Sequence, residues 1–176
     1  MENIKFVVDT MLGDLARWLR IMGYDTVYSD NYNDKQIIEI ALLGDRVIIT
    51  RDKSLYIKAR KASAKVILVE SIDTREKIAE VAVKAKINIS VDPDKSRCPE
   101  CNGVLEKTND KNRVKDRVPP QALASYNTFY ICTKCSKVYW EGGHWINIRR
   151  LIENAKELAK EYNKTMYKRR ADLLPA

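Results

Sequence analysis

Two pairs of cysteines constrain the fold of this chain more than any other feature of its sequence. The 176-residue chain has four cysteines, in two Cys-x-x-Cys pairs with thirty residues between them: Cys98, Cys101, Cys132 and Cys135. A Cys-x-x-Cys turn directs two thiolates toward one point, and two such turns supply the tetrahedral sulfur set that Zn²⁺ accepts. We therefore expect one structural zinc ion. Four cysteine ligands close its coordination shell, so this ion should not catalyse.

Two other interpretations of the cysteines stay open. Disulfide bonds occur in the cytosol of some thermophiles. A redox-active Cys-x-x-Cys would require one pair to lie on a strand-to-helix turn, whereas both pairs follow the strand-and-helix region described next. His144 is the single histidine, and the complete cysteine set makes it an improbable zinc ligand.

Strand and helix patterns alternate strictly over about the first ninety residues. Short apolar runs predict strands at residues 4–9, 24–29, 46–50 and 65–70. Helical spacing of apolar residues, with Asn or Asp at the entry or Gly at the end, predicts helices at residues 11–23, 31–44, 52–64 and 73–87. Such alternation, with strands that are apolar throughout, indicates an α/β fold: an open parallel sheet with helices on both faces.

The composition changes near Pro93, where a polar stretch predicts a linker. We therefore predict three units: an α/β domain at residues 1–92, a zinc-ribbon module at residues 93–148 (the ribbon module), and a basic amphipathic C-terminal helix at residues 149–176. An apolar stripe on this helix predicts that it packs on another part of the chain: Leu151, Ala155, Leu158 and Tyr162.

The chain carries a net charge of +8, and half of this excess lies in residues 149–176, which hold eight Lys/Arg and four Asp/Glu. A basic terminal segment suits a polyanion such as nucleic acid, although charge alone is better explained by a solvated helix face. No apolar run approaches the roughly 18 residues of a membrane span, and no signal-peptide pattern opens the sequence. We expect a cytoplasmic protein with no membrane partner.

Carboxylates follow the predicted strands. Asp9 ends the first strand and Asp52 the third, Asp30 and Asp34 follow the second, and Asp14 lies in the first helix. In open α/β sheets, ligands bind beyond the carboxyl ends of the strands. Clustered carboxylates repel each other unless a cation joins them, and their hard oxygen ligands favour Mg²⁺ or Mn²⁺, ions that assist phosphodiester hydrolysis. Any one of these acids alone is better explained as a helix cap. Asp9 and Asp52 together favour a metal site.

Five segments in order resemble the Mut7-C RNase family: VVDTMLGDLARWLRIMGYDTVY, ITRD, SRCPECNG, DRVPP and CTKCSKVYWEGGHW. The resemblance covers residues 4–152. The family is described as a PIN-like α/β domain fused to a zinc ribbon, so the resemblance implies a metal-dependent ribonuclease with a PIN-type acidic site. We therefore expect RNA as the partner, with ribosomal RNA as one candidate, and no small-molecule cofactor.

The resemblance also implies roles for individual residues. Asp9 matches the acid at the end of the first strand, Thr50 and Asp52 match a Thr-x-Asp motif, and Asp34 matches the second acid, with Glu39 as the alternative. The fourth acid has no clear match, and Asp14 and Asp30 are its candidates. Asp9, Asp34 and Asp52 would then hold Mg²⁺ or Mn²⁺, and Thr50 would orient Asp52 or a metal-bound water.

Three arginines are candidate phosphate contacts: Arg17, Arg20 and Arg51. Packing beside the apolar stripe of its helix explains Arg17 nearly as well, and an exposed arginine such as Arg51 is just as often a plain surface residue. The main rival function is a non-catalytic RNA-binding or ribosome-associated module whose acids only cap helices. An α/β phosphatase is weaker, because Asp9 is followed by Thr10 and Met11 and not by an Asp-x-Asp motif.

Overall fold

A four-stranded parallel sheet forms the centre of the first part of the chain. The computed structural model describes the backbone of residues 4–171 and the side-chain surroundings of residues 4–165. The strands lie in the order β2-β1-β3-β4, all parallel. Their bounds are β1 Lys5–Val8, β2 Thr26–Val27, β3 Arg46–Thr50 and β4 Val66–Leu68. This confirms the predicted parallel α/β fold.

Helices connect these strands and cover both faces of the sheet. They are a 3₁₀ turn η1 at Thr10–Leu12 and the helices α1 Gly13–Ile21, α2 Asp34–Gly44, α3 Lys53–Lys61 and α4 Thr74–Ala85. Local chemistry sets where several begin: Asn33 and Gln36 form a capping box at α2, and Asp73 caps α4. Each helix begins near the carboxyl end of the preceding strand, so the helix entries gather at one edge of the sheet, which we call the carboxyl edge.

Alternate residues of the strands point to opposite faces of the sheet and belong to two separate hydrophobic cores. Phe6 and Val8 point to one face, where they pack with α1 and α4. Val7 and Ile48 point to the opposite face, where they pack with α2 and α3. All four side chains are fully buried, so both faces of the sheet are covered, as their near-continuous apolar sequence predicts.

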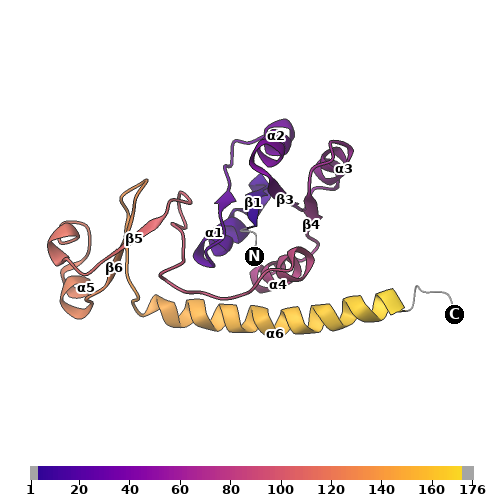
Figure 1. The fold of residues 1–176 in the computed structure, drawn as a ribbon. Coiled ribbons are helices and arrows are strands. Elements are labelled where there is room, and N and C mark those ends of the chain that lie inside the picture. The colour runs from indigo at the N-terminus through magenta and orange to yellow at the C-terminus, as the bar shows by residue number, and fades with distance from the viewer. Residues whose placement is uncertain (1–3, 172–176) are drawn as a thin grey trace.

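A long helix, α6, spans His144–Ala171. It begins five residues before the predicted helix unit and lies along α4, and it joins the ribbon module to the α/β part (Figure 1). Ile152 and Ala155 are fully buried in the core on the α1 and α4 face. The apolar stripe of this helix therefore completes one layer of the α/β fold.

The ribbon module is a small antiparallel sheet with its own core. Its strands lie in the order β5-β6-β7, with bounds Leu105–Thr108, Phe129–Cys132 and Val138–Tyr139. Between the cysteine pairs the chain also forms a short 3₁₀ turn η2 at Lys111–Arg113 and the helix α5 at Pro120–Ser125. Val114, Phe129 and Ile131 are buried against one another. The thirty-residue gap thus builds a core that the metal alone would not provide.

No helix in the described part of the chain is long and apolar enough to cross a membrane.

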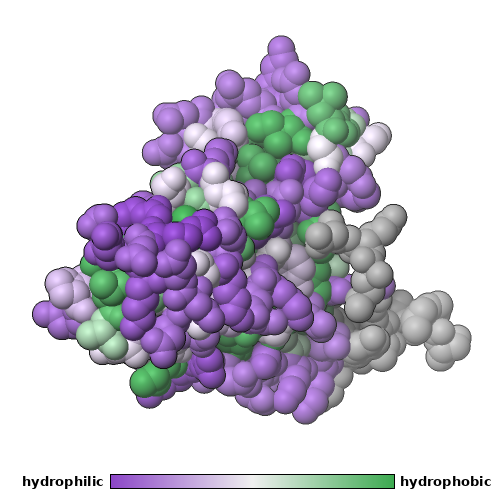
Figure 2. All heavy atoms as spheres, turned by 60° about the vertical axis from the view of Figure 1, so that its left-hand side comes forward, coloured by the Kyte–Doolittle hydropathy of each residue, from purple (hydrophilic) through white to green (hydrophobic). Residues whose placement is uncertain are grey.

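Figure 2 shows a mostly hydrophilic surface on the side turned toward the ribbon module, with hydrophobic side chains near the top of the molecule, where α2 and α3 lie. Leu42, Leu43 and Ile57 are the large exposed apolar residues of these two helices.

Candidate active site and metal centre

Asp9, Thr50 and Asp52 lie together at the carboxyl edge, because β1 and β3 are neighbours in the sheet. The Thr50 hydroxyl donates to Oδ2 of Asp9 at 2.6 Å, and its oxygen accepts the backbone N–H of Asp52 at 2.8 Å. Thr50 is fully buried and Asp9 is 6% exposed. One hydroxyl therefore links the ends of the two strands. Its proton orients the side chain of Asp9, whereas the sequence had suggested that Thr50 orients Asp52 or a metal-bound water.

Both acids also cap helices. Asp9 accepts the N–H of Thr10 at 2.7 Å at the start of η1, and Asp52 accepts the N–H of Ser54 at 2.6 Å at the start of α3. Capping and metal binding are therefore not exclusive here. Each carboxylate uses Oδ1 for its cap, and a carboxylate oxygen has a second lone pair that remains able to accept.

Asp34 reaches the same edge from α2 but does not cap it, because Asn33 does. Its Oδ2 accepts a hydrogen bond from Nζ of Lys58 on α3 at 2.7 Å. This hydrogen bond, with attraction to Asp34 and also to Asp52, raises the pKa of Lys58 above its ordinary value. An ammonium group therefore lies in the field of two of the predicted metal ligands.

The three carboxylates do not form a closed ligand cage. Among the described residues, one set of three or more potential ligands has all its ligand atoms within 4.8 Å of one another, and that set is the four cysteines. Asp9, Asp34 and Asp52 lie along the same edge of the sheet, but their carboxylate oxygens do not converge on one point. A single ion that contacts all three would require side-chain movement or intervening water.

The other candidate acids lie in different surroundings. Asp14 accepts hydrogen bonds from Lys77 and Thr74, both at 2.9 Å, and so ties α1 to α4. Burial raises the pKa of Asp14, but these hydrogen bonds outweigh that effect and lower it below its ordinary value. Asp30 and Glu39 are exposed, and Asp30 accepts a hydrogen bond from Asn31.

Arg20 has a different role from the predicted phosphate contact. It is 5% exposed, and its guanidinium donates to three backbone carbonyls: Thr26 at 2.9 Å, Pro99 at 2.9 Å and Glu100 at 3.1 Å. The physical reason is the direction of α1, which starts at the carboxyl edge and runs back to the opposite edge, where β2 begins. The structure therefore assigns Arg20 to docking the first cysteine turn, and this corrects its predicted role in RNA binding.

Arg17 and Arg51 are more accessible. Arg17 forms an ion pair with Glu100 of the same cysteine turn, and its side chain is 56% exposed. Arg51 is exposed between Thr50 and Asp52 at the carboxyl edge. Of the three arginines, Arg51 is the one adjacent in sequence to the predicted catalytic residues.

Replacing Arg20 with methionine should destabilise the protein strongly. The change leaves the buried carbonyl of Thr26 and the partly buried carbonyls of Pro99 and Glu100 without their donor, and a buried unsatisfied group costs about 1–3 kcal/mol. We expect the free energy of unfolding in urea to fall by about 2–3 kcal/mol. Arg17→Met is the matched control one turn away. It removes only an exposed pair and should cost less than about 1 kcal/mol. Equal losses in the two variants would contradict the docking role.

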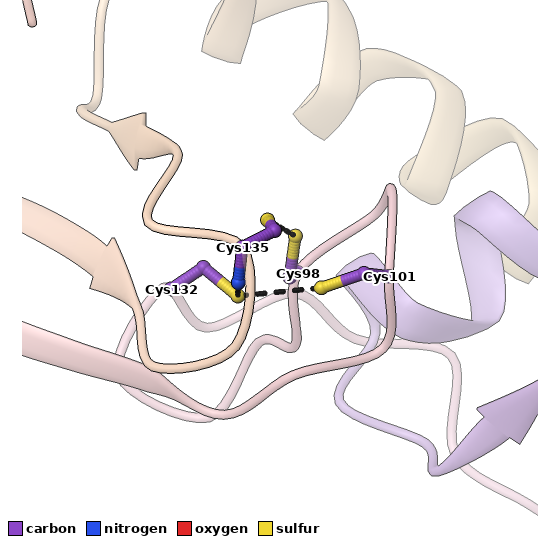
Figure 3. Close-up of side chains that lie close together, drawn as sticks. All are labelled: Cys98, Cys101, Cys132 and Cys135. Atoms are coloured by element: carbon purple, nitrogen blue, oxygen red, sulfur yellow. Dashed lines mark hydrogen bonds between the residues drawn. The ribbon is translucent and has the colours of Figure 1, made fainter.

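The four cysteines converge on one point between the ends of β5, β6 and β7 (Figure 3). The Sγ atoms of Cys98 and Cys135 lie 3.6 Å apart, and those of Cys101 and Cys132 lie 3.4 Å apart. A disulfide would require about 2.05 Å. A tetrahedron with Zn–S bonds of about 2.3 Å has edges of about 3.8 Å. These sulfur separations are closer to those of a zinc site than to those of disulfides.

Backbone groups around one of the four sulfurs, that of Cys132, favour its thiolate form. The backbone N–H groups of Lys134 and Cys135 both donate to Cys132 Sγ at 3.4 Å. Burial raises the pKa of the Cys132 thiol, but these N–H groups outweigh it and lower that pKa to about 7. A Cβ on Gly103 would lie 2.7 Å from the same sulfur, so glycine is required there. The set of donors therefore suits a zinc ion.

The first cysteine turn is built into the edge of the α/β sheet. Asn102, at a positive φ of 65° directly after Cys101, accepts the N–H of Thr26 at 3.0 Å and donates to Asp25 at 2.7 Å. Asp25 also forms a two-bond ion pair with Arg46. Burial raises the pKa of Asp25, but the hydrogen bonds from Arg46 and Asn102 lower it below its ordinary value. Sequence reasoning missed this contact. Its one local signal is the Asn-Gly pair after Cys101.

A family model described as the Mut7-C RNAse domain matches residues 4–152 of the chain. Neither the curated proteins nor the solved structures give a match. The matched residues include both the carboxyl edge and the four cysteines. The match indicates a ribonuclease-type function, with RNA as substrate or partner.

Proposed function

We propose that this chain, which belongs to the Mut7-C RNAse domain family, is a divalent-metal-dependent ribonuclease with a PIN-like acidic site at its carboxyl edge. One observation carries the proposal: Thr50 holds Asp9 in a fixed orientation beside Asp52, at the ends of two adjacent parallel strands. A nearly buried carboxylate at a strand end, aligned by a buried hydroxyl, is the arrangement expected of a metal ligand with its supporting hydrogen bond.

Asp9, Asp34 and Asp52 would hold the ion, and their oxygen ligands suit Mg²⁺ or Mn²⁺. The ammonium group of Lys58 supports this assignment, because it occupies a position where Asp34 and Asp52 attract positive charge. When bound, a divalent ion supplies an activated water and stabilises the leaving oxygen of a phosphodiester.

The protein residues position the substrate and the acids. Thr10 and Thr50 fix the two oxygens of Asp9. Arg51 is placed to contact a phosphate next to the scissile bond, and its guanidinium suits phosphate oxygens. Arg17 remains a further candidate contact, since an exposed ion pair such as that with Glu100 is weak.

The proposal is tested by incubating the full chain with end-labelled single-stranded RNA in Mn²⁺, in Mg²⁺ and without added divalent ion. We expect the RNA to be cleaved when Mn²⁺ or Mg²⁺ is present and to stay intact without added divalent ion. A DNA strand of the same sequence serves as the substrate control. RNA that binds and stays intact under all three conditions would contradict the nuclease assignment.

Thr50→Val should impair cleavage without removing any carboxylate. Valine has nearly the same shape, but it cannot donate to Asp9 or accept the N–H of Asp52. Loss of a hydrogen bond that supports a metal ligand typically lowers metal affinity or activity about 10–100-fold. Thr50→Ser, which keeps the hydroxyl, should restore most of the activity. The two variants can be compared by initial cleavage rates across Mn²⁺ concentrations, and equal rates would contradict the role given to the hydroxyl.

A second candidate function is a non-catalytic RNA-binding or ribosome-associated protein. The observation that favours it is that Asp9 and Asp52 both cap helices and so already have structural roles. This alternative predicts RNA binding with no cleavage.

We also propose that the chain divides into an α/β domain (1–92), the ribbon module (93–148) and a C-terminal helix (149–176).

We further propose that the protein is cytoplasmic. Thiols that lie at metal-ligand distances, and not as disulfides, suit a reducing compartment.

A further inference from the structure

A groove of about 790 Å³ lies between the C-terminal half of α4, the segment that follows it, and α6. Figure 1 shows α4 lying against the middle part of α6. The groove is lined by five apolar residues, two asparagines and four lysines, with no acidic residue among them. The lysines are Lys84, Lys86, Lys156 and Lys160. Its volume falls within the range of about 300–1,000 Å³ that is usual for ligand sites.

The apolar part of the groove is continuous with the protein core. Ile87 and Ile89 pack against the core cluster on the α1 and α4 face and also line the groove. Both are only partly buried. The groove therefore offers apolar surface as well as positive charge.

The lysines differ in how firmly they are held. Lys84 is fixed by Glu80 and by the carbonyl of Leu68 at 2.7 Å. Lys156 and Lys160 pair with Glu153 and Glu157, three residues before each of them on α6.

Such same-helix pairs on the surface are worth about 0–1 kcal/mol, so phosphate can displace them. Lys86 is exposed at the end of α4. Three of the four lysines can thus turn toward a bound polyanion.

We propose that this groove binds single-stranded RNA, as a second contact region for the substrate of the carboxyl edge. The inference rests on the proposed ribonuclease function. The lysines match phosphates, and the apolar surface matches exposed bases. A duplex would satisfy only the lysines, because its bases are paired and stacked inside. This combination of surfaces therefore selects a single strand.

The position of the groove sets the length of RNA that can use it. α4 starts at the carboxyl edge, where Thr74 contacts Asp14, and ends at the groove. Its twelve residues span about 18 Å at about 1.5 Å per residue. At about 3.4 Å per stacked nucleotide, about five nucleotides cover this distance. Longer strands can contact both regions, and shorter ones cannot.

The test compares two triple variants of the full chain. In the groove variant, Lys86, Lys156 and Lys160 are replaced with alanine. In the control variant, Lys5, Lys61 and Lys65 are replaced with alanine. The control residues are exposed and lie near the amino ends of the strands. Both variants lose three positive charges. Fluorescence anisotropy with a labelled 20-nucleotide single-stranded RNA, without added divalent ion, gives affinity at several salt concentrations.

The groove variant should bind at least about tenfold more weakly than the wild type. Its salt dependence, as the slope of log K against log salt, should become shallower by about 2, because each lost phosphate contact on a single strand contributes about 0.7. The control variant should stay within about threefold of the wild type. Equal losses in both variants, no loss in the groove variant, or an equal loss with duplex RNA would overturn the proposal.

Cleavage assays separate this inference from the proposed function. The groove variant should cleave a three-nucleotide RNA, which is too short to reach the groove, as fast as the wild type, and it should cleave a 20-nucleotide RNA with a raised KM. If the wild type cleaves nothing but the binding results hold, the nuclease assignment fails and the groove assignment stands. If cleavage is intact but the KM for the long RNA is unchanged in the groove variant, the groove assignment fails alone.

Discussion

Replacing Asp9 with asparagine is expected to lower metal-dependent RNA cleavage by at least about 100-fold. This loss is larger than the one expected when only a hydrogen bond that supports a metal ligand is removed, which is about 10–100-fold. Asparagine has the same shape, and its oxygen still accepts the Thr10 N–H. It removes the charge that holds a divalent cation. The amide also places a donor or a neutral oxygen opposite the Thr50 hydroxyl, which now donates to Oδ2 at 2.6 Å. Asp52→Asn should reduce cleavage to a similar extent.

RNA affinity and stability distinguish loss of catalysis from loss of fold. Both variants should bind RNA as tightly as the wild type or more tightly, because a negative charge near phosphate is gone. Asp9→Asn should cost about 1–2 kcal/mol of stability, since a charge-assisted hydrogen bond in a nearly buried site becomes neutral. A structural capping role predicts only these small changes, because asparagine also caps well. Full cleavage activity in both variants would exclude the carboxylate site.

Asp45→Asn is the matched control for these variants. Asp45 precedes β3 whereas Asp52 follows it, so the two acids lie at opposite ends of one strand. Its side chain is 83% exposed, and its φ of 46° is one that asparagine tolerates well. The change removes only an exposed ion pair with Lys65, which is worth about 0–1 kcal/mol. The control should therefore keep full cleavage and nearly full stability.

Removing zinc is expected to have the second large effect. Structural zinc contributes about 10–16 kcal/mol of apparent binding free energy in zinc-finger peptides. A whole domain is usually stable by only about 5–15 kcal/mol, so loss of the ion is enough to unfold a small module. Cys98→Ser should therefore lower the bound zinc from about one ion per chain and unfold the β5-β6-β7 sheet at room temperature. Metal analysis and amide hydrogen exchange measure the two effects.

Loss of zinc should also reach the α/β part at one defined place. The turn that contains Cys98 carries the carbonyls bound by Arg20 and the Asn102 side chain bound to Thr26. Amides near β2 should exchange faster, while those of β3 remain protected. Thr133→Ser, an exposed substitution between the second pair of cysteines that keeps its hydroxyl, should change neither measurement. Purified protein with no zinc and with oxidised thiols would contradict this prediction.

The sequence was sufficient to predict the elements of the fold, because their signals are local. Apolar runs such as Val47 to Ile49 and the caps at Asn33 and Asp73 act within a few residues. The order of the strands could not be predicted in this way, because it depends on contacts between distant segments. The same limit applies to α6. Its apolar stripe predicted burial, and only the fold shows that α4 is the partner.

The candidate sites divide along the same line. Spacing alone identified the cysteines, since four ligands in two pairs have few other uses. The carboxyl-edge acids followed from a rule about parallel sheets, which places strand ends without positioning side chains. That rule could not foresee that Asp34 pairs with Lys58. For Arg20 the reasoning failed because it fixed the residue on a helix without asking which end of that helix lies near the acids.

The contact between Asn102 and β2 also bears on the solubility of the protein. β2 is a two-residue strand at the outer edge of the sheet. An open edge strand presents unpaired backbone groups that can pair with another chain and start aggregation. The outward N–H of Thr26 is instead taken by the Asn102 side chain at 3.0 Å. The ribbon module thus covers an edge through which two copies of the sheet could otherwise associate, and protein deprived of zinc should aggregate from this side.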